Sequence, residues 1–187
     1  MYYSFVKSKE TDYLNVRDKR NEPNLRLLHA VLGIQCEFEE YMQAYDKQDK
    51  TNLLEELGDL MFYAHIISDE FCFDLINGFD KEIYFYQCKI SELLEYSLDA
   101  VKKQVFHVDE KSDYKMTKIR QSDIADLALY TLSLAKKHCE EYGIKFVDLL
   151  EMNMAKLDKR YKSSVTTKES DNRNIQNEMS HFKKGNK

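Results

Sequence analysis

The 187-residue sequence contains no tryptophan, one proline and only five glycines. Because proline and glycine are the residues that most often interrupt helices, their scarcity beside 33% charged residues predicts a nearly all-helical protein. No apolar run approaches the roughly 20 residues that a membrane-spanning helix needs. The first five residues do not have the character of a signal peptide. We therefore expect a cytoplasmic protein with no membrane partner.

Cysteine pairs and an excess of basic residues are also missing. The four cysteines, at positions 36, 72, 88 and 139, form no CxxC motif, and each falls in a helical pattern. We expect them to be reduced and buried thiols. The formal net charge of −5 argues against a nucleic-acid partner. Hydrophobic residues make up 43% of the chain, which is enough for one domain, or for two small ones that share a core.

Two amphipathic segments, 24–45 and 51–69, dominate the first half of the chain. On a helical wheel of about 100° per residue, each has one apolar stripe. The short polar stretch between them predicts an antiparallel helical hairpin. Asn52 and Glu55 have the spacing of a capping box at the start of the second helix. The two stripes are Leu27, Val31, Ile34, Phe38, Met42 and Tyr45, and then Leu53, Leu57, Leu60, Ala64, Ile67 and Phe71.

Two carboxylate pairs flank these stripes, Glu37 with Glu40 and Glu56 with Asp59, each at i, i+3. In an antiparallel hairpin both pairs fall on the same side and at the same height. Four carboxylates in one patch repel one another, and a divalent cation relieves that repulsion. Oxygen ligands suit Mg²⁺ or Mn²⁺, and Mg²⁺ usually accompanies a phosphate substrate. Either pair alone is more typical of a solvated acidic face, but the matched pairs favour a metal site.

The stretches LLHAVLGIQCEFEE and LLEELGDLMFYA resemble the MazG-like all-α nucleoside triphosphate pyrophosphohydrolases, whose signature is ExxE followed by ExxD. The resemblance implies that Glu37, Glu40, Glu56 and Asp59 bind Mg²⁺ and are catalytic. It also implies hydrolysis of a (deoxy)nucleoside triphosphate to the monophosphate and pyrophosphate. Members of the family usually build the site in a dimeric bundle, so a homodimer or higher oligomer is implied as well. Glu39 and Gln43 depart from the pattern, which affects the expected nucleotide preference more than the metal site.

A closing helix is predicted over 145–161, where LLEMNMAKLDKRY resembles the last helix of the same family. Asn153, Lys156 and Arg160 share one face at i, i+3, i+7. Without the resemblance, these residues are typical of a basic helix C-terminus that complements the helix dipole. With it, they look like substrate-contacting residues, in which Lys156 and Arg160 hold the polyphosphate. Tyr161 would stack on the base.

Two further helices are predicted over about 81–105 and 122–142, with Ser122 as the cap of the second and Gly143 as its stop. The segment SDIADLALYTLSLA is similar to LEELGDLMFYAHII, and this aligns Asp123 with Glu56 and Asp126 with Asp59. The pair would form a degenerate second hairpin, packed on the first as a pseudo-dimer within one chain.

Two registers compete for the helix over 81–105. In one, Glu92 and Glu95 take the positions of the first ExxE. In the other, which aligns the apolar stripes, Leu93 and Tyr96 occupy those positions. We prefer the second register, because burial constrains a helix more than the spelling of a motif. The predicted architecture is therefore an antiparallel helical bundle over 1–161, followed by a polar tail at 162–187 that we expect to be disordered.

The sequence favours a Mg²⁺-dependent nucleoside triphosphate pyrophosphohydrolase. Two other classes stay open. One is a sensor that binds a nucleotide, such as an alarmone, without hydrolysing it. The other is a non-catalytic helical module that binds a protein partner. His29, near the acids, is more typical of a structural residue than of a ligand.

Overall fold

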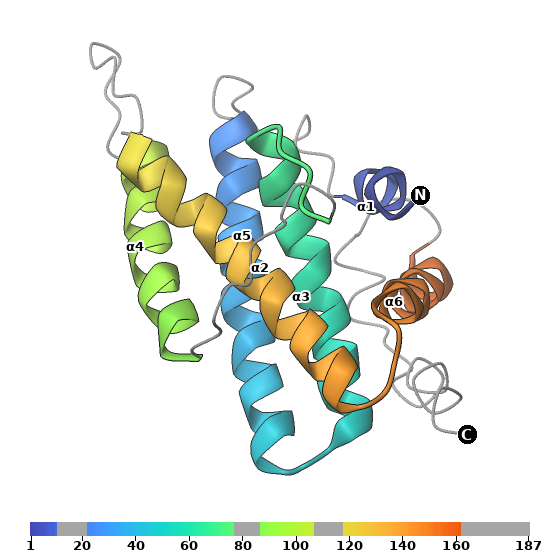
Figure 1. The fold of residues 1–187 in the computed structure, drawn as a ribbon. Coiled ribbons are helices and arrows are strands. Elements are labelled where there is room, and N and C mark those ends of the chain that lie inside the picture. Colours follow the sequence, from blue (N-terminus) through green and yellow to red (C-terminus); the bar gives the residue numbers. More distant parts are fainter. Residues whose placement is uncertain (11–21, 77–86, 107–117, 162–187) are drawn as a thin grey trace.

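The computed structural model describes residues 1–10, 22–76, 87–106 and 118–161, which form a bundle of six helices without a strand (Figure 1). This confirms the all-α bundle that the composition predicts. None of these helices is long and apolar enough to cross a membrane. Predictions for the tail at 162–187, for the charged loop after residue 106 and for the first turns of the helix expected from about residue 81 lie outside the described residues. In chain order the helices are α1 (Tyr2–Lys9), α2 (Glu22–Asp46), α3 (Lys50–Glu70), α4 (Gln87–Phe106), α5 (Lys118–Glu141) and α6 (Phe146–Arg160).

The helices α2 and α3 form the predicted antiparallel hairpin at the centre of the bundle. Gln48 takes a positive φ of 54° in the turn between them. The cap of α3 is Asp49, whose side chain accepts a hydrogen bond from the backbone N–H of Asn52 at 3.1 Å. The predicted capping box at Asn52 and Glu55 is therefore wrong, because the helix begins at Lys50, just after a better-placed carboxylate.

The buried face of α2 follows the predicted stripe except at its end. Leu27, Val31, Ile34 and Phe38 are buried, whereas Tyr45 is 46% exposed. Tyr41 is fully buried in its place, and its hydroxyl lies 2.8 Å from the Nε2 atom of His138. Because α2 packs on both α3 and α4, its buried face is wider than one stripe.

The helices α4 and α5 pack on each other, with α4 also against α2 and α5 also against α3. This is the arrangement expected of a second hairpin lying on the first. Ser122 lies inside α5 and not at its start, since the helix begins at Lys118. Gly143 follows α5 with a φ of 65°, and the N–H of Ile144 reaches back to the carbonyl of Cys139 at 2.8 Å, as a glycine stop requires.

The register of α4 agrees with the alignment of apolar stripes. Leu93 and Leu94 are buried, while Glu92 and Glu95 are exposed. The ExxE of this helix therefore points to solvent. Tyr96 is also exposed, so only Leu93 of the two aligned positions contributes to the core.

The short helix α1 packs on α3 and α6, and α6 packs on α3 (Figure 1). In the sequence analysis no helix is predicted here. An ionic cluster ties the ends of three helices together, because the Arg26 guanidinium of α2 contacts Glu10, after α1, and both Asp69 and Glu70 of α3.

The cysteines are only partly as predicted. Cys139 is buried, but Cys36 and Cys72 are free and exposed. Cys36 lies on the outer side of α2, and Cys72 follows the end of α3 with a φ of 56°. A helical pattern indicates a helix but does not assign each cysteine to its buried side, which is why this prediction failed at two positions.

Candidate metal centre

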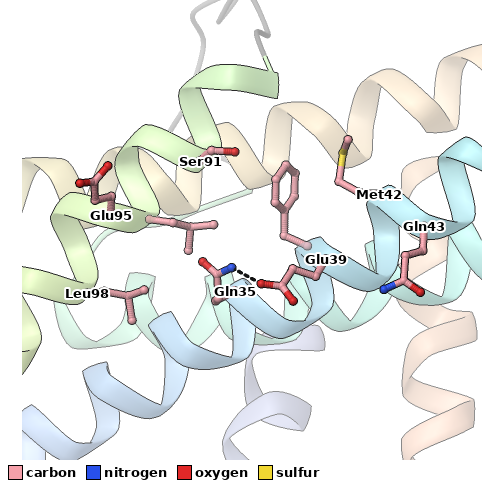
Figure 2. Close-up of a pocket in the computed structure, with 9 residues that line it drawn as sticks. Gln35, Glu39, Met42, Gln43, Ser91, Glu95 and Leu98 are labelled. Atoms are coloured by element: carbon pink, nitrogen blue, oxygen red, sulfur yellow. Dashed lines mark hydrogen bonds between the residues drawn. The ribbon is translucent and has the colours of Figure 1, made fainter.

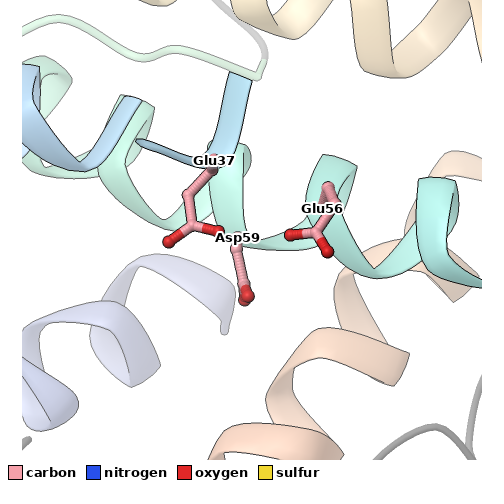
Figure 3. Close-up of side chains that lie close together, drawn as sticks. All are labelled: Glu37, Glu56 and Asp59. Carbon is pink, nitrogen blue, oxygen red and sulfur yellow. The ribbon is translucent and has the colours of Figure 1, made fainter. Parts of the chain in front are cut away.

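The central hairpin brings three carboxylates together, Glu37 from α2 with Glu56 and Asp59 from α3 (Figure 3). One ligand oxygen from each lies within 4.8 Å of the others. The two helices approach closely beside this cluster, since a Cβ atom built at Gly33 would lie only 2.3 Å from the Tyr63 ring. Because Gly33 has no side chain, the Tyr63 ring can pack directly against the backbone of α2.

Two acids of the cluster, Glu37 and Glu56, have raised pKa values. Burial raises the pKa of Glu37 to about 8, and the negative charge of Asp59 adds to that effect. Burial likewise raises the pKa of Glu56 to about 10, together with the charges of Asp59 and Glu37. A hydrogen bond with Glu56 acts in the opposite direction on the pKa of Glu37. Neighbouring carboxyls whose pKa values are raised in this way are expected where negative charges lack a compensating cation.

Asp59 is held by two side chains from α6. Asn153 donates from Nδ2 to Asp59 Oδ1 at 2.7 Å, and the Lys156 ammonium donates to Asp59 Oδ2. Lys156 also lies 3.4 Å from Glu55 Oε1. Its side chain is 0% exposed, and its ammonium forms ion pairs with these two carboxylates inside the protein. Proximity to Asp59 and Glu55 raises the pKa of Lys156 in spite of burial, and the ammonium form persists.

The fourth predicted ligand, Glu40, does not belong to this group. Its side chain is exposed on α2, and it is absent from the set of mutually close ligand atoms. It still lies near enough for its charge to raise the pKa of both Glu37 and Glu56. One turn along α2 from Glu37, Glu40 faces the rim of the cluster and not its centre.

The four residues predicted to contact substrate divide into two kinds. Asn153 and Lys156 are fully buried and engaged with Asp59. Arg160 is partly exposed, and its guanidinium lies 5.0 Å from the centre of the Tyr161 ring. Tyr161 is itself buried, and its backbone carbonyl accepts a hydrogen bond from Lys9. The structure therefore places only Arg160 of these four at an accessible edge.

Sequence reasoning missed Tyr2 and Glu55 as neighbours of the site. One signal for Glu55 was available in α6, where Lys156 shares a face with Leu149 and Asn153. A lysine on an apolar face must be buried with acidic partners, and α3 supplies them. His29 packs edge-on against the Tyr63 ring, with 5.4 Å between centroids, and burial lowers its pKa.

Asp123 and Asp126 of α5, which the sequence aligns with Glu56 and Asp59, belong to no group of three mutually close ligand atoms among the described residues. Asp126 is half-buried, and burial together with the charge of Asp123 raises its pKa, while Lys89 of α4 acts in the opposite direction. Within the part of the chain that the structure describes, Glu37, Glu56 and Asp59 are the one group of three or more ligand atoms close enough to share a metal ion.

A hollow of about 760 Å³ lies between α2 and α4 (Figure 2), and Glu37 is not among the residues that line it. Glu39 and Glu95 border it, and Gln35 donates a hydrogen bond to Glu39 there. Carboxylates at the rim oppose binding of a polyphosphate, so this hollow does not compete with the metal centre as a nucleotide site. Its apolar lining comes from Phe38, Met42, Leu94 and Leu98.

No family model, no curated protein and no solved structure matches the chain.

Proposed function

We propose that the protein hydrolyses (deoxy)nucleoside triphosphates to the monophosphate and pyrophosphate, with Mg²⁺ or Mn²⁺ held by Glu37, Glu56 and Asp59. The reaction and the bond that breaks come from the resemblance of the hairpin to the MazG-like enzymes. The structure supports the cation independently of that resemblance.

The observation that carries the proposal is the partly buried triad, whose ligand atoms lie within 4.8 Å of one another. Two oxygens on one Mg²⁺ lie roughly 3 to 4 Å apart, given a bond length of about 2.1 Å. Small side-chain movements therefore bring Glu37, Glu56 and Asp59 onto one ion. The raised pKa values of Glu37 and Glu56 support the proposal, because a bound cation would favour the carboxylate forms that burial and neighbouring charges disfavour.

A bound divalent cation would offset the charge of the phosphate oxygens and lower the pKa of a coordinated water. The water oxygen would attack the α-phosphorus, the bond from that phosphorus to the oxygen shared with the β-phosphate would break, and pyrophosphate would leave. Glu40 would accept the proton that the water gives up, because it is exposed and its charge acts on both Glu37 and Glu56. Arg160 provides the accessible cation that would contact the departing pyrophosphate. Lys156 is fully buried, so its proposed role changes from binding phosphate to holding Asp59.

The test is a panel of nucleoside and deoxynucleoside triphosphates with Mg²⁺, read by release of pyrophosphate. Glu56→Gln removes one ligand while keeping the size of the side chain. Glu39→Gln is the matched control, since Glu39 lies exposed on the other side of α2. We expect pyrophosphate from the wild type and the control, and a loss on the order of 100-fold or more in Glu56→Gln. If no nucleotide yields pyrophosphate, the protein is not this enzyme.

A non-catalytic interaction module is the second candidate, and the apolar hollow between α2 and α4 is the observation that favours it. In that case a partner helix would occupy the hollow and the acids would be structural. Leu98→Asp would then abolish binding of the partner helix, while Glu37→Gln would leave that binding intact. The enzyme proposal expects Glu37→Gln, and not Leu98→Asp, to abolish pyrophosphate release, so assaying both variants separates the two.

A further inference from the structure

The N-terminal helix α1 reaches the metal centre through one side chain, Tyr2. The residue lies at the first position of α1 and is 6% exposed. Its hydroxyl lies 2.7 Å from Asn153 Oδ1 and 3.5 Å from the carbonyl of Gly58. Because a phenol has one proton, that proton goes to the nearer acceptor, Asn153.

This hydrogen bond determines which end of the Asn153 amide faces Asp59. An amide has one oxygen that accepts and one nitrogen that donates. With Oδ1 accepting from Tyr2, Nδ2 is directed to Asp59 Oδ1, where it donates at 2.7 Å. The flipped amide would set its oxygen against the carboxylate and lose both bonds.

Packing fixes the relative positions of Tyr2, Asn153 and Asp59. Asn153 is fully buried against α3, where a Cβ atom at Gly58 would lie 2.9 Å from its Cβ and Nδ2 atoms. The Tyr2 ring packs edge-on against His65, with 4.8 Å between centroids. Burial and the charge of Asp59 raise the pKa of Tyr2, so its hydroxyl stays a donor.

We propose that Tyr2 is a positioning residue for the metal centre, acting through Asn153 to orient the Asp59 carboxylate toward Glu37 and Glu56. Asn153 takes a lone pair on Oδ1 and Lys156 takes one on Oδ2, so the carboxylate cannot rotate and its remaining lone pairs stay available. A ligand fixed in this way loses little freedom when the ion binds. This inference rests on the proposed metal site and adds a residue that neither the motif nor the closing helix contains.

The test measures affinity for Mn²⁺ alone, by the electron paramagnetic resonance signal of the free ion. Tyr2→Phe keeps the ring and removes the hydroxyl. Tyr3→Phe is the matched control, because Tyr3 is exposed and hydrogen-bonds to Asp69, away from the triad. We expect Tyr2→Phe to weaken Mn²⁺ binding about 10-fold or more, as for other groups that orient a metal ligand. Tyr3→Phe should bind like the wild type.

A double-mutant cycle then asks whether Tyr2 acts through Asn153. If it does, Tyr2→Phe added to Asn153→Ala weakens Mn²⁺ binding no further than Asn153→Ala alone. Additive losses would overturn the proposed route, and equal affinity of wild type and Tyr2→Phe would overturn the role itself. Neither result touches the proposed hydrolysis. A wild-type protein that binds no Mn²⁺ would instead remove the metal site and, with it, any centre for Tyr2 to position.

Discussion

The paired acids Glu37 and Glu56 make the metal-free protein less stable as pH rises. Their pKa values in the folded protein are about 8 and about 10, above the ordinary 4.5 of an unfolded glutamate. The folded state therefore keeps a proton that the unfolded chain has already lost. This contribution to stability is fully present below about pH 4.5 and is lost as pH rises toward the folded pKa values.

The size of the effect follows from the number of retained protons. Counting only the proton on Glu56, whose pKa is about 10, one retained proton changes the free energy of unfolding by about 1.4 kcal/mol per pH unit. Between pH 5.5 and 7.5 this amounts to about 2.7 kcal/mol. For a chain of this size, the melting temperature falls by roughly 5 to 11 °C over that interval.

The assay is thermal unfolding with a chelator present, followed by circular dichroism from pH 5 to 8. Other groups also titrate in this range, so the quantity compared is the difference in slope between wild type and Glu56→Gln. The glutamine needs no proton to pair with Glu37, and the variant should be the more stable protein at pH 7.5 but not at pH 5. Glu39→Gln should follow the wild type. Identical slopes for wild type and Glu56→Gln would refute the claim that Glu56 keeps its proton in the folded protein.

Other perturbations test the packing around the site. Lys156→Met should cost roughly 3–5 kcal/mol in urea unfolding, because it leaves buried carboxylates without their cation; a loss below 1 kcal/mol would mean that the ion pair is dispensable. Gly33→Ala should destabilise the protein by about 1–3 kcal/mol, since the new methyl group meets the Tyr63 ring, and should also weaken Mn²⁺ binding. Tyr41→Phe should cost about 1 kcal/mol by removing the hydrogen bond to His138, and unchanged stability would contradict that contact.

Much of the fold could be predicted from sequence periodicity. Four of the helices were expected within a few residues of their observed bounds, because long stripes of leucine, isoleucine and valine leave little choice of buried face. The predicted buried face fails where a helix packs against more than one other helix. Tyr41 is buried where Tyr45 was expected, and its hydroxyl lies beside His138 of α5; no periodicity in α2 alone reports that contact.

The candidate site was predictable to the extent that it is local. Glu37, Glu56 and Asp59 lie on one hairpin, and its short turn determines their relative height. The contributions of α1 and α6 were not accessible in the same way. Tyr2 and Asn153 are separated by most of the chain, and only the packed bundle shows that they touch.

Lys156 leaves room for a metal ion in spite of its own positive charge. Its ammonium contacts Asp59 and Glu55, and its charge also acts to lower the pKa of Glu37, but burial outweighs that effect. Glu37 and Glu56 form no ion pair with any residue in the described part of the chain, and they rely on a retained proton instead. A divalent cation would displace that proton and bind all three acids. Lys156 would continue to offset the negative charges of Asp59 and Glu55. Binding of the metal should therefore release protons and strengthen as pH rises toward 8, which is the opposite of the trend in the stability of the metal-free protein.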